Sequence, residues 1–361
     1  MVKINYIKFN NFRNFSNYEL SFDKKINIFY GKNGCGKTNI LEGISLIAKG
    51  RGLRNSNISN LIKINENTFM IKSSLEIQNS NFDIKIFAEN KNDKFKKIIK
   101  LNDDFSKESL NFLNQSISYL IFIPEMERLF QASPSFRRNF IDRLIFSSRN
   151  DYNTLVNRYK KFLLERIKLL QNNYIDEDWL NQIERKICTL GLEIYESRSS
   201  QLNLINNNIK ILNSSHKFEI NVDLKIEDEF FKNDINFEKY LSNLFDSRSY
   251  DKHHGGTKIG PHRSDIIAII NNEYEASLLS TGQQKTVVLM ILLSQCYYLV
   301  NSKKINPILL LDEIGSHLDN YNRQILLDMI NNFNIQFFLT GTDKNFFSFI
   351  STNAHFYNIG E

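Results

Sequence analysis

An octapeptide near the N-terminus restricts the possible folds of this chain more than any other feature. Residues 31–38 read GKNGCGKT and match the pattern GxxxxGK[ST] of phosphate-binding loops. The loop lies between an apolar segment at residues 26–30, predicted to be a strand, and a helical pattern at residues 38–49. A strand, this loop and a helix in succession predict an α/β fold in which helices cover a parallel sheet.

The loop has the residue types that binding of a nucleoside triphosphate requires. Its glycines let backbone N–H groups approach phosphate at the positive end of a helix. Lys37 is expected to contact the β- and γ-phosphates, and the Thr38 hydroxyl to coordinate Mg²⁺. The predicted cofactors are therefore ATP and Mg²⁺. The predicted nucleotide contacts in this segment are Gly31, Lys32, Asn33, Gly34, Cys35, Gly36, Lys37, Thr38 and Asn39.

A second nucleotide-site feature is an apolar run at residues 308–311 that ends in Asp312 and Glu313. Asp312, at a strand end, can hold Mg²⁺ opposite Thr38. Glu313, the next residue, is expected to point in a different direction from Asp312 and can orient or deprotonate an attacking water. The predicted catalytic residues are thus Lys37, Asp312 and Glu313, and the predicted metal ligands are Thr38 and Asp312. Because Lys37 and Asp312 are 275 positions apart (312 − 37), a large segment is inserted between the two halves of the site.

Residues 279–283 read LSTGQ and lead into a predicted helix at residues 281–300. They resemble the LSGGQ signature of ABC-type ATPases, in which two heads pair head-to-tail and the signature of one contacts the γ-phosphate bound by the other. Ser280, the Gly282 N–H and the helix N-terminus would form an anion site, with Gln283 as a further contact. The alternative is a serine that only caps the helix. Residues 316–319 resemble the D-loop that crosses the dimer interface in that superfamily.

The whole chain resembles the RecF family of bacterial recombination-repair ATPases, which is related to SMC heads. The matching segments are NFRN at 11–14, TNILE at 38–42, GRGLR at 50–54, SPSFRR at 133–138, GPHRSD at 260–265 and STGQQK at 280–285. The resemblance implies a two-lobed head, ATP-dependent homodimerisation, slow ATP hydrolysis and binding to single- and double-stranded DNA. It also implies that the protein works with RecR and RecO to place RecA on gapped DNA in recombinational repair and replication restart.

Two coupling elements of ABC-type ATPases depart from their usual pattern. Pro124-Glu125 stands where a Q-loop carries glutamine, and Gln131 is the nearest amide, so the residue that couples the lobes is undecided. Thr340-Gly-Thr342 stands in place of the switch histidine of transporters. A threonine hydroxyl there is expected to sense γ-phosphate less strongly than a histidine.

Two arginines have two possible roles each. Arg13 is a predicted contact of phosphate or adenine, and Arg51 resembles the arginine that SMC heads aim at the site. Both are equally compatible with surface ion pairs. The sequence does not decide between these roles.

Changes of pattern along the chain predict two lobes. Residues 1–122 together with 301–361 are expected to form ATPase lobe I, with a parallel sheet plus an antiparallel subdomain. Residues 123–300 are expected to form lobe II, with the signature and a helical arm at 134–214. A helix break at Asn172–Asn173 predicts that the arm folds back on itself as a hairpin.

Composition bears on partners and location. The net charge of +6, from 46 Lys+Arg and 40 Asp+Glu, mildly favours a polyanionic partner such as DNA. Three widely separated cysteines argue against a disulfide framework and fit a reducing cytoplasm. No signal peptide and no run of about 20 apolar residues is present, so a cytoplasmic protein without membrane attachment is expected. Candidate phosphate contacts, for which a solvated face is the commoner explanation, are Lys94, Lys96, Lys97, Lys100, Arg158, Lys160, Lys161, Arg166 and Lys168.

Two other classes of ABC-type ATPase share part of this pattern. A transporter subunit is expected to have a switch histidine and fewer residues than the 243 that separate Lys37 from Ser280 (280 − 37). A long-coiled-coil SMC-like head is expected to have a longer arm and a hinge. The RecF-type interpretation therefore accounts for more of the chain than either alternative.

Overall fold

The computed structural model describes residues 2–48, 50, 52–54, 56–91, 94–172, 174, 176–216, 220–230, 235–315, 319–350 and 353–360. The chain divides into two compact units. Unit 1 comprises Met1–Glu127 and Thr281–Glu361, and unit 2 comprises Arg128–Ser280. The predicted lobe boundaries are at residues 122 and 300. The main difference concerns the helix that follows Ser280, which is expected in lobe II and lies in unit 1.

Unit 1 contains two five-stranded sheets. The first is antiparallel, in the order β2-β1-β4-β5-β6, and the second is parallel, in the order β13-β3-β12-β11-β7. The strands are β1 (Val2–Phe12), β2 (Phe15–Ser21), β3 (Ile26–Tyr30), β4 (Met70–Ile77), β5 (Ser80–Lys91), β6 (Lys94–Leu101), β7 (Tyr119–Phe122), β11 (Ile308–Leu311), β12 (Phe337–Gly341) and β13 (Ala354–Asn358). The helices are α1 (Lys37–Ser45), η1 (Ile58–Leu61), α2 (Lys107–Ser116), α8 (Thr281–Tyr297), η4 (Tyr298–Ser302), α9 (Asn320–Asn332) and η5 (Lys344–Phe347), and η2 (Pro124–Gln131) spans the boundary with unit 2.

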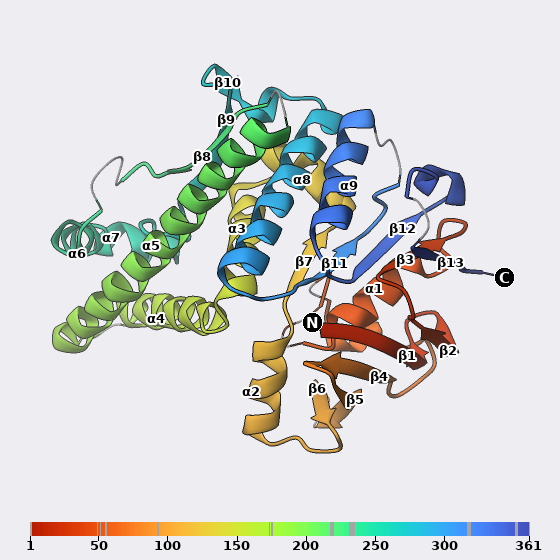
Figure 1. The fold of residues 1–361 in the computed structure, drawn as a ribbon. Coiled ribbons are helices and arrows are strands. Elements are labelled where there is room, and N and C mark those ends of the chain that lie inside the picture. Colours follow the sequence, from red (N-terminus) through yellow and green to blue (C-terminus); the bar gives the residue numbers. More distant parts are fainter. Residues whose placement is uncertain are drawn as a thin grey trace. The chain divides into compact units, whose positions relative to one another are not determined.

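The two sheets differ because their residues alternate differently. In β11 all four residues are buried, as the continuous apolar run at 308–311 requires of a strand covered on both faces. In β1, by contrast, fully buried and partly exposed positions mostly alternate. Figure 1 shows β3, β12, β11 and β7 side by side at the centre of unit 1. The predicted fold class, a parallel sheet plus an antiparallel subdomain, is confirmed.

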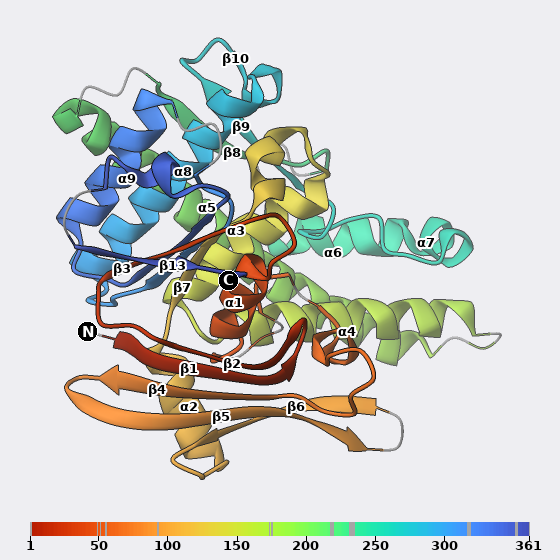
Figure 2. The same cartoon turned by 90° about the vertical axis from the view of Figure 1, so that its right-hand side faces the viewer.

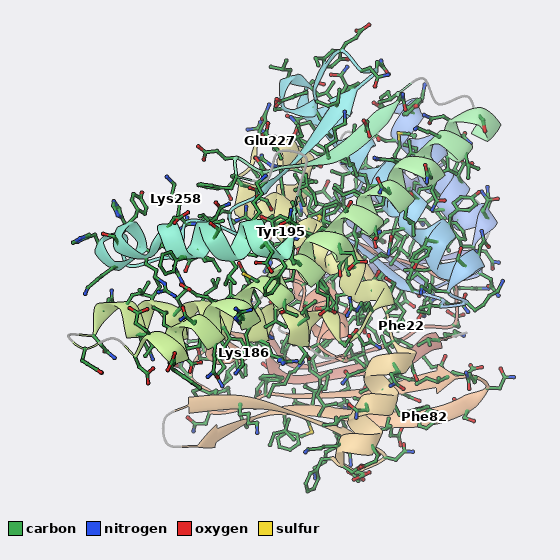
Figure 3. All side chains as sticks on the ribbon, turned by 90° about the vertical axis from the view of Figure 1, so that its left-hand side faces the viewer. Phe22, Phe82, Lys186, Tyr195, Glu227 and Lys258 are labelled. Carbon is green, nitrogen blue, oxygen red and sulfur yellow. The ribbon has the colours of Figure 1, made fainter. Side chains whose placement is uncertain are left out.

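The antiparallel sheet carries a helix that the sequence patterns do not predict. Figure 2 shows α2 lying across the strands of this sheet. Phe82 of β5 packs on Phe112 of α2 with ring centroids 5.3 Å apart, and Figure 3 labels Phe82. Ser106 caps the helix by accepting a hydrogen bond from the Ser109 N–H at 3.2 Å. The helix has a recognisable start but only 10 residues, too few for a clear helical spacing of apolar residues.

Unit 2 consists of long helices and a small sheet in the order β10-β9-β8. Its α4 and α5 lie side by side (Figure 1), and the predicted fold-back after residue 171 is confirmed at Asn172, which leaves the helical conformation. Asn173 lies outside the described residues. The elements are α3 (Pro134–Ser148), α4 (Tyr152–Gln171), α5 (Glu177–His216), β8 (Val222–Glu227), α6 (Phe237–Asp246), α7 (Arg248–His254), β9 (Asp265–Ile270), β10 (Tyr274–Glu275) and η3 (Ala276–Leu278).

One arginine of α4 is the centre of a buried hydrogen-bond network in unit 2. Arg166 is 0% exposed and donates to Glu184 at 2.9 Å and to Asp251 at 2.6 Å. It also donates to the Leu244 carbonyl at 2.8 Å and to the Thr257 hydroxyl at 3.1 Å. Arg166 is therefore neither of the two things that the sequence allowed, a candidate phosphate contact or a solvated cation, because a buried charge must be paired inside the protein.

Candidate nucleotide-binding site

The phosphate-binding loop has the backbone conformation that its glycines allow. Gly31, Gly34 and Gly36 have φ of 145°, 83° and 113°, a region that L side chains rarely adopt. A Cβ on Gly36 would also come within 2.7 Å of the Asn14 side chain. The loop can therefore follow this path only with glycine at these positions, and α1 begins directly after it at Lys37.

The lysine of the loop is held at its centre. Lys37 is 5% exposed, and its ammonium donates to the carbonyls of Gly31 at 2.7 Å and Lys32 at 2.9 Å. These bonds direct the Nζ atom across the loop instead of outward. A lysine in this position can transfer its hydrogen bonds to phosphate oxygens with little movement of its stem.

The parallel sheet brings the two halves of the site together. Leu339 of β12 pairs with Ile28 of β3 on one side and with Leu311 of β11 on the other. The carboxyl ends of these strands therefore lie next to one another, although β3 and β11 are far apart in the sequence. Ligands of open α/β sheets bind at this edge.

Four side chains or backbone groups meet there. Thr38 Oγ1 donates to Asp312 Oδ1 at 2.9 Å, and Thr340 Oγ1 donates to the same oxygen at 2.7 Å. The Glu313 N–H donates to Thr340 Oγ1 at 2.7 Å. The structure thus places the predicted metal ligands Thr38 and Asp312 in direct contact.

Glu313 differs from Asp312 in both exposure and backbone conformation. Asp312 is 3% exposed, whereas Glu313 is an exposed residue. Glu313 has a φ of 49°, in the left-handed region. That conformation costs a non-glycine residue about 1–2 kcal/mol, and residues held in it often lie at functional sites. The two acids therefore suit the separate roles predicted for them, a buried ligand and an accessible base.

The oxygen atoms at Asp312 fit a magnesium ion. Burial raises the pKa of the Asp312 carboxyl above its usual range, while the hydrogen bonds from Thr340 and Thr38 lower it. A divalent cation would favour the charged form that burial disfavours. Mg²⁺ takes a few protein oxygens and completes its shell with water and phosphate. The described residues contain no cluster of three or more His, Cys, Asp or Glu that could hold a metal.

Asn14 is a residue of this site that sequence reasoning missed. Its side-chain NH₂ donates to the Cys35 carbonyl at 3.0 Å, and its oxygen accepts from the Asn39 amide at 2.8 Å. Asn14 thereby connects the turn between β1 and β2 to both sides of the loop. The NFRN block contains this residue, but only the three-dimensional contact shows what it does.

Arg13 is engaged in a structural ion pair. Its guanidinium donates to Glu42 at 2.7 and 2.8 Å, to the Asn60 carbonyl at 2.7 Å and to the Ser56 hydroxyl at 2.8 Å. Glu42 is 0% exposed, so its charge needs this partner. Of the two roles left open for Arg13, the geometry favours the ion pair over a nucleotide contact.

Lys97 binds the backbone that follows the C-terminal end of α1. Its ammonium donates to the carbonyls of Leu46, Ala48 and Gly50 at 3.2, 3.1 and 2.8 Å. These carbonyls follow α1, which ends at Ser45, earlier than the predicted residue 49. Burial lowers the pKa of Lys97 to about 8. Lys97 is therefore excluded as a candidate phosphate contact, because its hydrogens are used inside unit 1.

The signature residues lie at the start of α8. Ser280, Gly282 and Gln283 are exposed, and a Cβ on Gly282 would meet nothing within 4 Å. Further along the helix Lys285 is 2% exposed and donates to Glu127 at 2.8 Å and to the Ile314 carbonyl at 3.5 Å. The start of α8 is thus open to a ligand, while its next turn is tied to the segment that follows Glu313.

Other candidate coupling residues are only partly described. Gln131, the candidate Q-loop amide, donates to the Ser277 carbonyl at 3.1 Å within unit 2. Asp319 caps α9 by accepting from the Asn322 N–H at 2.7 Å. Arg51 and residues 316–318 of the D-loop-like segment lie outside the described residues, so the predictions made for them are unchanged.

The GPHRSD segment of unit 2 contains buried, partly buried and exposed residues, and its histidine joins a hydrogen-bonded chain. His262 Nε2 lies 2.8 Å from the Thr257 carbonyl and therefore carries the proton. Its Nδ1 accepts from the Tyr159 hydroxyl at 2.8 Å, which in turn accepts from Tyr240 at 3.1 Å. Gly260 has a φ of 128°, and a Cβ there would meet the two tyrosine oxygens at 2.2 and 2.4 Å. The glycine lets the turn approach this hydrogen-bonded chain.

We expect His262 to make the stability of the protein depend on pH. Burial lowers its pKa to about 4, from an ordinary value of 6.5, and nearby arginines add to the effect. Below pH 6.5 the unfolded chain therefore binds a proton that the folded chain does not. Stability is complete above this pH and is lost as the pH falls towards the folded-state value. The expected loss from this group is roughly 3 kcal/mol.

The measurement is urea unfolding of the unaltered protein and of His262→Gln between pH 7.5 and 4.5. The variant should show the flatter profile, because it lacks the titrating ring. His253→Gln, which replaces an exposed histidine of α7, is the control and should follow the unaltered protein. Parallel profiles for all three proteins would contradict the assignment.

The phosphate loop and the carboxylate strand of the parallel sheet, together with the signature helix, define the class of the protein: a P-loop ATPase head of the ABC type. The family model described as RecF/RecN/SMC N terminal domain matches residues 3–359. The chain belongs to the RecF family within this class.

Individual relatives support the same assignment. The "DNA replication and repair protein RecF" of Rickettsia felis is 34% identical over 337 residues, which cover 92% of this chain and 91% of the relative. The protein of the same name from Rickettsia massiliae is 33% identical over 348 residues and 95% of each chain. Among solved structures, the recombination mediator protein RecF with ATPrS in the RecFOR pathway has a TM-score of 0.84, 27% identity and coverage of 99% and 97%.

A more distant likeness concerns the fold alone. An Smc head domain from Pyrococcus furiosus, bound to the C-terminal domain of ScpA, has a TM-score of 0.53 at 19% identity. It covers 96% of this chain, and this chain covers 92% of it.

Every helix in the described part of the chain is too short or too polar to span a lipid bilayer.

Proposed function

We propose that this chain is an ATP-dependent DNA-binding repair protein of RecF type. The observation that carries the proposal is the contact of Thr38, the last residue of the phosphate loop, with Asp312 at 2.9 Å, next to the exposed Glu313. A chain of this family with such an edge has the groups that bind a nucleoside triphosphate and hydrolyse it slowly. The relative solved with ATPrS supports ATP as the nucleotide.

The residues of the loop and the strand ends divide the work of hydrolysis. Lys37 would bind the β- and γ-phosphates, and Thr38 and Asp312 would hold Mg²⁺. When bound, this ion neutralises charge on the phosphate oxygens. Glu313 would accept a proton from the water that attacks the γ-phosphorus, as the bond to the β-phosphate oxygen breaks and ADP and phosphate form.

The signature residues are proposed to act on a second copy of the chain. Ser280, the Gly282 N–H and the start of α8 form an exposed site for the γ-phosphate held by that copy. Gln283 lies in the same exposed turn. A site shared in this way closes only when ATP is present, so ATP would drive homodimerisation.

DNA is the proposed macromolecular ligand, bound without sequence preference, and RecR is the proposed protein partner, with RecO and RecA in the same pathway. Relatives named for DNA replication and repair, and the RecFOR pathway of the solved relative, support these partners. We place the protein in the cytoplasm on the same grounds. Exposed cations of the α4–α5 pair that could contact phosphate include Arg158, Lys160, Lys161, Lys168 and Lys186, the last labelled in Figure 3.

Ser280→Arg is expected to abolish ATP-dependent dimers. The bulky cation would occupy the exposed turn, and dimer affinity should fall by more than about tenfold, or about 1.4 kcal/mol. Sedimentation velocity with ATP and Mg²⁺ measures this directly. Lys37→Arg should also remain monomeric, whereas Ser302→Arg, an exposed serine beyond the other end of α8, should dimerise like the unaltered protein.

Dimers of Ser280→Arg at the level of the unaltered protein would contradict the role of the signature in a second copy.

The same sedimentation runs with duplex DNA at low and high salt test the DNA ligand. Co-sedimentation should weaken steeply as salt rises, because phosphate contacts release counterions. DNA binding that salt leaves unchanged would argue against phosphate contacts.

A further inference from the structure

Thr340 occupies a central place in the parallel sheet of unit 1. It is the fourth residue of β12, the strand that lies between β3 and β11. It pairs with Phe29 of β3, one residue beyond the pair of Leu339 with Leu311 of β11. Its side chain is 0% exposed. The residue therefore sits between the strand that leads to the phosphate loop and the strand that leads to the two acids.

The hydroxyl of Thr340 connects two consecutive acidic residues. It donates its one hydrogen to Asp312 Oδ1 at 2.7 Å and accepts the Glu313 N–H at 2.7 Å. Thr38 donates to the same Asp312 oxygen at 2.9 Å. Asp312 is thus oriented from both sides, by one threonine of the phosphate loop and by one of β12.

The second bond of Thr340 acts on the backbone of Glu313. That residue has a φ of 49°, which a non-glycine residue keeps only when its surroundings hold it there. The Thr340 oxygen is the acceptor that fixes the peptide N–H of this strained residue. Loss of the hydroxyl would remove one of the two hydrogen bonds to Asp312 Oδ1 and the bond that the Glu313 N–H makes to Thr340.

We propose that Thr340 is a positioning residue that holds the metal ligand Asp312 and the base Glu313 in one fixed arrangement. The inference rests on the ATP hydrolysis proposed above and assigns a role that differs from sensing of γ-phosphate. Thr340 acts through the two acids. Because one hydroxyl bonds both residues, binding of a cation at Asp312 would also affect the orientation of Glu313. The role requires the oxygen of the side chain and not its methyl group.

The test compares Thr340→Val, which keeps the shape and removes the hydroxyl, with Thr340→Ser, which keeps the hydroxyl. Thr340→Val should lower kcat for ATP hydrolysis by roughly ten- to a hundredfold, because small misplacement of catalytic groups costs this much. Nucleotide affinity without Mg²⁺ should change less than about threefold, because the phosphate loop is untouched. The Mg²⁺ concentration that gives half of the full nucleotide affinity should rise in the valine variant only.

Thr340→Ser should keep kcat within about threefold. Thr68→Val is the matched control, since it removes another hydrogen-bonded hydroxyl of unit 1, one that donates to the Ala88 carbonyl at 2.9 Å, and should leave hydrolysis unchanged. If Thr340→Val does not fold, Thr340→Ala replaces it in the same comparison with Thr340→Ser. A valine or alanine variant as active as the unaltered protein would overturn the proposal, and so would an equal loss in the serine variant.

Failure of this inference is distinguishable from failure of the proposed function. If the unaltered protein neither binds nor hydrolyses ATP, the proposed function itself is refuted. If the unaltered protein hydrolyses ATP and Thr340→Val does so equally well with the same Mg²⁺ dependence, only the positioning role is refuted.

Discussion

Replacement of Glu313 by glutamine is expected to lower the rate of ATP hydrolysis by about 10²–10⁴-fold. Glutamine preserves the size of the side chain and the peptide N–H that Thr340 accepts, but its amide cannot take a proton from water. Binding of ATP should stay within about threefold, because the groups of the phosphate loop are unchanged. Phosphate release at saturating ATP and equilibrium binding of the nucleotide are the two measurements.

Dimers provide a second readout of the same variant. Glu313→Gln should form ATP-dependent dimers that outlast those of the unaltered protein, since slow hydrolysis keeps the triphosphate in place. Glu125→Gln is the comparison, because Glu125 is an exposed acid that follows β7, the strand beside β11. A large loss in Glu125→Gln with full activity in Glu313→Gln would transfer the role of base to Glu125.

Replacement of Arg166 by alanine is expected to cost about 3–5 kcal/mol of the free energy of unfolding. The change leaves Asp251, at 0% exposure, and Glu184, at 1%, with their charges buried and a partner removed. Glu184 keeps a bond from Arg248 at 2.6 Å, whereas the remaining donors to Asp251 are the neutral Ser247 hydroxyl and Lys258 N–H. Asp251 should therefore account for most of the loss.

Urea unfolding with a double-mutant cycle tests this account. In the background of Arg166→Ala, the further change Asp251→Asn removes the unpaired charge and should restore part of the lost stability. Lys168→Ala, an exposed cation of the same helix, should stay within about 0.5 kcal/mol of the unaltered protein. A loss below about 1 kcal/mol in Arg166→Ala would mean that the network contributes little.

Part of the fold and of the site is predictable because it depends on local order. The phosphate loop, the apolar run before Asp312 and the turn at Ser280 each combine a short motif with the strand or helix that the motif requires. The continuous apolar run at 308–311 distinguishes a buried parallel strand from the alternating strands of the other sheet. These features predicted the α/β class and the strand-end site that the structure contains.

Polar residues outside these motifs were harder to interpret. Arg166 and Lys97 have the sequence context of surface cations, yet one is buried among acids and the other holds the carbonyls that follow α1. Asn14 lies in the NFRN block and Thr340 in the segment that replaces the switch histidine, but their partners lie 21 and 28 positions away. No local pattern identifies those partners.

The sequence alone determined which chemical groups form the proposed phosphate site, because glycines, a lysine and a threonine hydroxyl follow one another in fixed succession within one turn. Only the tertiary structure decided which oxygens and charges meet. Parallel pairing of β3, β12 and β11 joins residues hundreds of positions apart, and burial then obliges each remaining polar group to find a partner. Those partners depend on packing of the whole chain, so they emerge only when the chain is folded.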